Sequence, residues 1–223
     1  MQFFSYLING ISLGSVYALI ALGYTMVYGI AKMLNFAHGD VIMIGSYVVY
    51  FAFGASGLNP VLSIVLSMIV CTILGVVIER LAYRPLREAP SLAVLITAIG
   101  VSYLLQQVAQ LSWSSNPKSF TSVVSGMKPV SLFGGQLTIS AETIVTIVAC
   151  VVIMVVLMWF VNYTPAGHAM LAVSEDRGAA QLMGVNVNGT ISLTFAIGSA
   201  LAAIAGALLC SSYPTLQPTT GAM

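Results

Sequence analysis

Three adjacent charged residues, Glu175, Asp176 and Arg177, interrupt a chain in which only 6% of the residues are charged. Just before them, Ser174 is a residue type that caps helix N-termini, and acidic residues in a first helical turn are favoured by the helix dipole. Gly184 suits the left-handed position that follows a helix end. The pattern predicts a helix from about Ser174 to Gly184, which is too short to cross a membrane.

A short helix of this kind could lie on lipid headgroups or insert into another protein. Ala179, Ala180, Leu182 and Met183 would form its small apolar face. Helices on lipid surfaces favour Lys and Arg with bulky anchors, whereas acidic residues and alanines prevail here. A face of small residues suits close contact with a groove in another protein. The composition therefore favours protein docking, and the lipid-surface alternative stays open.

A second polar group, Asn35, His38 and Asp40 of the segment NFAHGD, lies between two apolar runs. Ionisable groups at membrane depth are costly to bury and are functional by default. At that depth His38 and Asp40 could couple ions, or the segment could line a solute path. In a surface turn, Asp40 would cap the next helix and His38 would be a solvated loop residue, which is the simpler interpretation of His38.

The fourth apolar run is unusually polar, and its side chains Gln106 and Gln110 share one face at a spacing of four. Hydrogen bonds between helices explain such residues most simply. A path lined by hydroxyl and amide groups would nevertheless suit a zwitterionic solute. The candidate translocation path comprises Asn35, His38, Asp40, Thr97 and Gln106.

Enzymatic chemistry finds little support in the sequence. There is no GxxxxGK[ST] phosphate loop, so any ATP must be bound by a partner. The segment FGASG around Ser56 has the wrong glycine spacing for a GxSxG nucleophile motif. Cys71, Cys150 and Cys210 lie in apolar stretches without metal-ligand spacing. An intramembrane hydrolase centred on Ser56 or His168 is the remaining enzyme hypothesis; we expect no catalytic residue, metal or cofactor.

Composition indicates that membrane helices position these residues. The chain is 59% hydrophobic and 6% charged, whereas soluble domains carry about 25% charged residues. Its 223 residues hold roughly five or six spans of about 20 residues each. A formal net charge of +1 leaves no basic surface for nucleic acid. We expect an all-α polytopic transmembrane bundle of about six spans, forming a single domain over residues 1–223.

Six apolar runs are the candidate spans. They cover residues 3–30, 41–57, 61–78, 91–111, 141–161 and 190–210. As a helix the first run would measure about 42 Å, more than the ~30 Å hydrocarbon layer, so it must tilt or break. The candidate break points are Gly10, Gly14, Gly23 and Gly29.

Three smaller patterns refine the elements between and within these runs. Ser140 is expected to cap the fifth run, and Gly134 and Gly135 favour a tight hairpin in the preceding segment. In the last run, small residues recur at intervals of four and offer a surface for close helix packing. These small residues are Gly198, Ala202 and Gly206.

Positive charges predict the orientation. The loop 79–90 holds three arginines and therefore marks the cytoplasmic side. Counting from this loop places the N-terminus outside, Lys32 and Arg177 inside, and Lys118 and Lys128 outside. If the first run made two crossings, or if NFAHGD lay within the bilayer, the N-terminus would be cytoplasmic instead.

Several separated motifs resemble one family. GHAMLAVSEDRGAAQLMGVN resembles the cytoplasmic coupling segment of ABC importer permeases, and GSVYALIALGYTMVYGIAKMLNFAHGD, ERLAYRP and LITAIG occur in the order seen in LivH-type permeases of branched-chain amino acid uptake systems. The similarity runs from about Ile8 to Met223. Members of that family continue beyond this point with a glycine-rich segment and further spans, so we expect a fragment or a C-terminally shorter chain.

The resemblance implies a multi-pass pore subunit of the bacterial inner membrane that gates a path for branched-chain or other apolar amino acids. Its implied partners are a second permease subunit, two cytoplasmic ATPase subunits and a periplasmic substrate-binding protein. The coupling residues that it implies are Glu175, Asp176, Arg177, Ala179, Ala180 and Gly184. An ion-coupled secondary transporter that uses His38 and Asp40 is the competing hypothesis.

Overall fold

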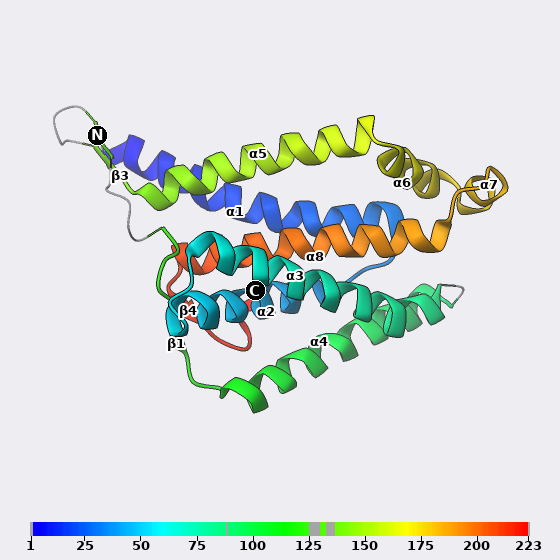
Figure 1. The fold of residues 1–223 in the computed structure, drawn as a ribbon, viewed down its shortest axis with the longest axis horizontal. Coiled ribbons are helices and arrows are strands. Elements are labelled where there is room, and N and C mark those ends of the chain that lie inside the picture. The colour runs from blue at the N-terminus through cyan, green and yellow to red at the C-terminus, as the bar shows by residue number, and fades with distance from the viewer. Residues whose placement is uncertain (1, 88, 125–129, 133–136, 223) are drawn as a thin grey trace.

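The computed structural model describes residues 2–87, 89–124, 130–132 and 137–222. Its long helices lie side by side along one common direction (Figure 1). The α-helices are α1 (Gln2–Ala31), α2 (His38–Val49), α3 (Pro60–Ile78), α4 (Ser91–Trp113), α5 (Ala141–Tyr163), α6 (Pro165–Glu175), α7 (Arg177–Leu182) and α8 (Val187–Ser212). The predicted all-α polytopic class is confirmed, and within the described residues five helices are long and apolar enough to cross a membrane: α1, α3 with its extension, α4, α5 and α8.

Short elements extend and connect these helices. Two π-helical turns, η1 (Tyr50–Ala55) and η2 (Glu79–Tyr83), continue α2 and α3, and η2 leads into the 3-10 turn η3 (Arg84–Leu86). Strands β1 (Lys118–Ser119) and β4 (Thr215–Leu216) pair antiparallel, as do β2 (Val130–Leu132) and β3 (Leu137–Ile139). The β2 and β3 pair is the predicted hairpin, although its turn residues, Gly134 and Gly135, lie outside the described residues. A last 3-10 turn is η5 (Thr220–Ala222).

The first apolar run is one uninterrupted helix, α1, which excludes the break at a glycine and the two crossings and leaves the tilt. Glycine in a helix costs only about 1 kcal/mol relative to alanine. A break at membrane depth would expose backbone groups that lipid cannot hydrogen-bond, at several kcal/mol for each group. A continuous helix is therefore the cheaper solution. The second run is also helical, as α2 and its π-helical continuation η1 over residues 38–55, but it is not among the five candidate spans.

Chain direction alternates, with α1, α3 and α5 running one way and α2, α4 and α8 the other (Figure 1). The C-terminal ends of α1, α3 and α5 therefore meet at one end of the molecule, together with α6 and α7. We call this the charged end, because it holds Lys32, Arg80, Arg84, Arg87 and Arg177. The strands β1 and β4, with Lys118, lie at the opposite end.

Helix α8 forms the centre of the bundle and packs against α1, α2 and α3. Its predicted small-residue surface is confirmed. A Cβ added at Gly198 would lie 2.9 Å from Cγ2 of Val27, and one at Gly206 would lie 2.6 Å from the carbonyl oxygen of Ile42. These two glycines therefore let α1 and α2 approach α8 more closely than any side chain would allow.

Caps agree with the sequence where a small polar residue precedes a helix. The hydroxyl of Ser140 accepts a hydrogen bond from the backbone N–H of Thr143 at 3.2 Å, as predicted, and Glu142 lies in the first turn of α5. The side chain of Asn59 caps α3 in the same way, with Pro60 as the first helical residue. All three cysteines are buried and free.

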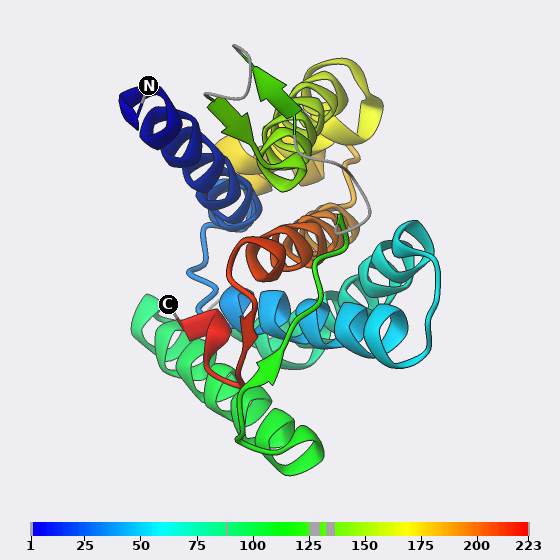
Figure 2. The ribbon, with the colours of Figure 1, turned by 90° about the vertical axis from the view of Figure 1, so that its left-hand side faces the viewer.

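After α8 the chain folds back against the start of α2, which the sequence did not indicate. Figure 2 shows this C-terminal segment, residues 213–222, between α8 and α4. A Cβ at Gly39 would collide with the carbonyl of Gly221, and a Cβ at Gly221 would collide with that of Gly39. Only glycine at both positions permits this crossing of two backbones.

Candidate functional site

A cavity of about 660 Å³ lies between α1, α2, α4 and the C-terminal segment. We call it the central cavity. Its polar lining residues include Tyr24, Asn35, His38, Ser102, Gln106 and Thr220. Its apolar lining includes Ile20, Ile42, Ile99 and Leu209. Among the described lining residues there is no aspartate, glutamate, lysine or arginine, so the walls offer neutral hydrogen-bonding groups and aliphatic surface.

Asn35 is held in the cavity wall by the second π-helical turn. Its side chain is 5% exposed, and its Oδ1 accepts a hydrogen bond from the hydroxyl of Tyr83 at 2.9 Å. Tyr83 is itself buried in η2 and contacts the ring of Phe195 in α8. Because the oxygen of Asn35 is used in this way, its NH₂ group is the part left to serve a solute.

His38 is buried in the wall, so its interpretation as a solvated loop residue is wrong. Its side chain is 3% exposed and packs over Gly23 of α1, where a Cβ would lie 2.8 Å from the imidazole ring. Among the described residues its Nε2 has no hydrogen-bond partner. A buried polar atom without a partner is costly, and here it belongs to a residue that lines the central cavity.

Asp40 supports the wall from behind and does not line the cavity. It is 1% exposed, and its Oδ1 accepts a hydrogen bond from Nε2 of Gln106 at 2.9 Å. The expected helix cap is wrong, since no side chain caps α2 in the structure. The bond instead joins α2 to α4 and leaves Oε1 of Gln106 as its free acceptor. Thr97 lies on α4 outside the cavity lining.

The predicted single helix from Ser174 to Gly184 is wrong. Glu175 is the last residue of α6, and the chain breaks at Asp176, which has extended backbone angles. The carboxylate of Asp176 caps α7 by accepting from the N–H groups of Gly178 at 2.7 Å and Ala179 at 3.0 Å. An aspartate competes for backbone N–H groups and so starts a new helix more readily than it continues one.

Gly184 ends α7 as predicted, with φ of +86°. Its N–H donates to the carbonyl of Gln181, and the N–H of Val185 donates to the carbonyl of Ala180, both at 3.0 Å. This pair of bonds is a Schellman motif, in which glycine takes the left-handed position.

The apolar face that α7 offers to a partner differs from the predicted one. Ala180 is only 4% exposed and packs into the bundle with Val185, so it is not available for docking. Leu182 and Met183 are instead 89% and 84% exposed at the tip of α7, beside the exposed Ala179. We call Ala179, Leu182 and Met183 the α7 tip.

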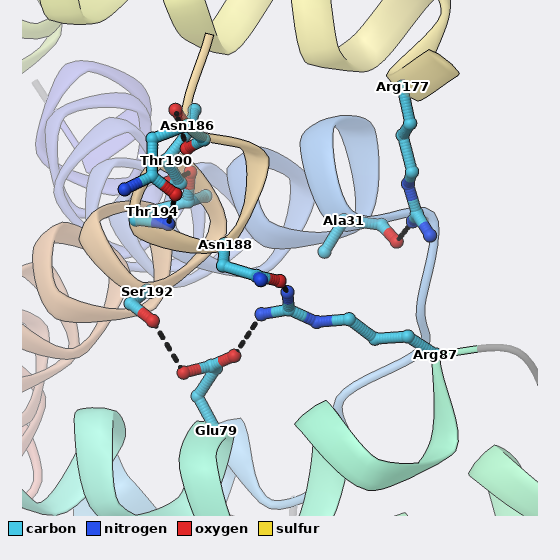
Figure 3. A network of polar contacts seen from close by, with 10 residues as sticks. Ala31, Glu79, Arg87, Arg177, Asn186, Asn188, Thr190, Ser192 and Thr194 are labelled. Atoms are coloured by element: carbon cyan, nitrogen blue, oxygen red, sulfur yellow. Dashed lines mark hydrogen bonds and ion pairs between the residues drawn. The ribbon is translucent and has the colours of Figure 1, made fainter. Parts of the chain in front are cut away.

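A buried polar network at the charged end was missed by the sequence analysis (Figure 3). Glu79 is fully buried, and its two oxygens accept from the guanidinium of Arg87 and from the hydroxyl of Ser192, the latter at 2.6 Å. Arg87 also donates to Asn188 at the start of α8. Nothing in the loop 79–90 indicates this pairing, because Glu79 and Arg87 are eight positions apart and Ser192 lies on another helix.

Arg177 makes a second connection at this end. Its guanidinium donates to the backbone carbonyl of Ala31, the last residue of α1 (Figure 3). Carbonyls in the last turn of a helix lack intrahelical partners, and a cation there also meets the negative end of the helix dipole. The start of α7 is thereby attached to the end of a helix that lines the central cavity.

Ser56 and His168, the two candidates for hydrolase chemistry, are exposed at opposite ends of the molecule. Ser56 directly follows η1, and His168 lies in α6. They form no catalytic pair.

Comparison with known proteins supports transport. The family described as "Branched-chain amino acid transport system / permease component" matches residues 6–223. The high-affinity branched-chain amino acid transport system permease protein BraD of Pseudomonas aeruginosa is 42% identical, over 96% of this chain and 73% of its own length. The corresponding LivH proteins of Salmonella typhimurium and Escherichia coli K12 are 40% and 39% identical over the whole chain and 75% of their own lengths.

No solved structure gives a significant match. The family match spans nearly the entire sequence, and both the membrane helices and the central cavity fall within it. This chain belongs to the family of permease components of branched-chain amino acid transport systems.

Proposed function

We propose that this chain is the membrane-spanning permease subunit of an ATP-driven importer that carries branched-chain or similarly apolar amino acids across the bacterial inner membrane. The family match over residues 6–223 is the observation that carries the proposal. In the proposed importer the chain works with a second permease subunit, two cytoplasmic ATPase subunits and a periplasmic substrate-binding protein. The charged end faces the cytoplasm, in keeping with the positive-inside rule.

The central cavity has the chemistry that such a solute needs. A zwitterion has no net charge, so an uncharged wall can solvate it through hydrogen bonds without leaving a buried ion unpaired. The NH₂ group of Asn35, Nε2 of His38 and Oε1 of Gln106 supply donors and acceptors. Aliphatic residues on the same wall suit a branched side chain. The solute path then consists of Asn35, His38 and Gln106, with Asp40 holding Gln106 in place.

The α7 tip is the site at which the ATPase subunits dock. Two exposed apolar side chains beside the acidic pair Glu175 and Asp176 give a tip that is apolar at its end and solvated at its base. Motion of α7 is passed to α1 through Arg177 and Ala31, and α1 lines the cavity. ATP-driven closure of the partners would thus shift the cavity between its inward-facing and outward-facing states.

Ion coupling through His38 and Asp40 is less well supported. Asp40 is buried, bonded to Gln106 and absent from the cavity lining, so an ion in the cavity would not meet its carboxylate. The named relatives are described as permease proteins of branched-chain amino acid transport systems.

Reconstitution tests the proposal. This chain is placed in liposomes with the ATPase subunits and the binding protein, with or without a paralogous permease as the second subunit, and uptake of radiolabelled leucine is followed with and without ATP. We expect uptake to require ATP, the ATPase subunits and the binding protein. Leucine uptake by the chain alone, driven by a proton gradient, would refute the proposal in favour of the secondary transporter.

The role of the α7 tip is tested by replacing Leu182 and Met183 with serine. Each buried Leu or Met side chain contributes about 1.5–3 kcal/mol, so co-purification of the ATPase subunits should fall at least about tenfold. Leu81→Ser is the matched control, because Leu81 is 76% exposed at the same end but lies outside the tip. Equal losses from both variants would mean that the tip is not the docking element.

The role of His38 is tested by His38→Leu. Losing one hydrogen bond to the solute should lower leucine uptake by about five- to tenfold, since such bonds contribute about 1 kcal/mol, while the ATPase subunits still assemble. Thr97→Val is the control, because Thr97 lies on α4 outside the cavity lining. Unchanged uptake by His38→Leu would remove His38 from the path.

A further inference from the structure

A second cavity, of about 350 Å³, opens at the charged end between the end of α1, η3 and the start of α4. We call it the basic pocket. Its lining includes Tyr28, Lys32, Leu34, Arg87, Ser91 and Arg177. Neither the central cavity nor the α7 tip includes it, so the transport mechanism leaves its role open.

Three cations from three separate segments converge on the basic pocket. Lys32 follows α1, Arg87 follows η3, and Arg177 begins α7. No acidic side chain lines the pocket among the described residues. Glu79 compensates the charge of Arg87 in the buried network of Figure 3. Lys32 and Arg177 therefore bring positive charge to the pocket without a matching carboxylate in its described lining.

The cations of the basic pocket disfavour one another. Burial, and then the charge of Arg87, lower the pKa of the Arg177 guanidinium below its usual value. An anion in the pocket would offset this penalty on Arg177.

The start of α4 also favours an anion in the basic pocket. Pro90 precedes the helix and provides no side-chain cap, and among the described residues the first backbone hydrogen bonds of α4 begin at the N–H of Ala93. Ser91 and Leu92 thus lie in the first turn, at the positive end of the helix dipole. Ser91 lines the pocket.

The rim of the pocket is apolar and exposed. Tyr28 is 49% exposed, Leu34 is 36% exposed, and Leu92, next to Ser91, is 64% exposed. A ligand with a phosphate head and hydrocarbon chains would place its charge among the three cations and its chains along these side chains. Basic pockets between helices on the cytoplasmic side are suited to such headgroups.

We propose that the basic pocket binds the phosphate of an anionic phospholipid from the inner leaflet, held by Lys32 and Arg177 beside the N-terminal end of α4. The lipid would fix the end of α1 against the start of α7. The choice of leaflet rests on the proposed orientation of the charged end. The binding itself is a property of this chain and is measured without the ATPase subunits.

The test compares lipid binding to the full-length chain in phosphatidylcholine nanodiscs with and without phosphatidylglycerol, with retained lipid counted by native mass spectrometry. We expect phosphatidylglycerol to be retained selectively. A basic residue near a membrane contributes about 1 kcal/mol to binding of anionic lipid, so Lys32→Gln and Arg177→Gln should each weaken binding by about fivefold. Arg84→Gln is the matched control, because it removes an exposed charge at the same end outside the pocket.

Several results would overturn the proposal. Equal losses in the Arg84→Gln control would indicate general attraction to the leaflet. Displacement of phosphatidylglycerol by millimolar-range inorganic phosphate, with no preference for the lipid, would indicate a site for free phosphate. Displacement by added ATPase subunits would mean that a protein carboxylate occupies the pocket.

Glu88 is tested by a separate variant, because it lies next to Arg87 in sequence and outside the described residues. We expect Glu88→Gln to bind phosphatidylglycerol at least as tightly as the wild type. If only Glu88→Gln bound the lipid, the carboxylate of Glu88 would be the native occupant and the proposal would fail. Leucine uptake by the reconstituted importer tests the proposed transport function. Lipid retention by this chain tests the basic pocket, so the two proposals are tested by separate measurements.

Discussion

Helices α5 and α8 are both apolar spans, yet they occupy opposite environments. In the most apolar 18 residues of each, mean hydropathy is 3.1 for α5 and 2.1 for α8, whereas 11% of the residues are buried in α5 and 72% in α8. The less hydrophobic helix is therefore the one at the core. Lipid tails are as apolar as leucine, so hydrophobicity does not draw membrane helices together, and close packing of small residues does.

The amino-acid compositions of α5 and α8 show this difference directly. Helix α5 is rich in valine, isoleucine and methionine, whereas α8 carries alanine, serine and glycine throughout its length. Bulky side chains on α5 face outward, as Val152, Val155 and Met158 do, each at least 53% exposed. Small residues on α8 let three neighbouring helices approach it, and polar contacts at its N-terminal end fix its position.

The largest expected effect concerns those polar contacts. Glu79→Ala would leave Arg87 without its buried carboxylate and Ser192 of α8 without its acceptor. Removing one partner of a buried ion pair costs about 3–5 kcal/mol, so the variant should unfold in detergent at much lower temperature. Glu142→Ala, in the first turn of α5, is the contrast and should cost at most about 1 kcal/mol. Similar melting temperatures for the two variants would break the comparison.

A smaller effect is expected from a single methyl group on the packed face of α8. Gly206→Ala would place a Cβ 2.6 Å from the carbonyl oxygen of Ile42, so two backbones must separate, at about 1–3 kcal/mol. Gly14→Ala on α1 is the matched control. No atom lies within 4 Å of a Cβ there, so alanine should be neutral or stabilise the helix by about 0.5–1 kcal/mol. Thermal unfolding followed by size-exclusion chromatography separates the two, and a loss in both would disprove the packing argument.

The smallest effect is expected on the outward face of α5. Val152→Leu and Val155→Leu should change the free energy of unfolding by no more than about 0.5 kcal/mol, because both side chains are more than half exposed to the surroundings. The measurement is the same melting curve. Strong destabilisation would show that a second subunit covers this face. The difference between α5 and α8 would then be one between a helix that faces a partner and a helix at the core of this chain.

Local signals predicted the elements well where one short pattern decides the structure. The apolar runs located the long helices, Ser140 capped α5, and Gly184 ended α7 in the left-handed conformation. They failed where two patterns competed. The segment around Asp176 reads as a first helical turn, yet Asp176 itself acts as a cap and divides the segment into α6 and α7.

The candidate site was only partly predictable for the same reason. Asn35, His38 and Gln106 were chosen because polar residues are expensive among apolar ones, and all three line the central cavity. The roles of Asp40 and Thr97 depended on which way each side chain faces, which the sequence does not state. Tyr83 and Thr220 were missed, because each reaches the site from a segment far away in the chain.

Length, hydropathy and family motifs can be read along the chain, and they were enough to identify a bundle of membrane helices of the permease family. The choice of the central helix, the crossing of the chain at Gly39 and Gly221, and the burial of particular carboxylates became visible in the folded molecule alone. These features depend on contacts between residues distant in sequence. In lipid such contacts are selected by shape and hydrogen bonding, because hydrophobicity favours every apolar face alike.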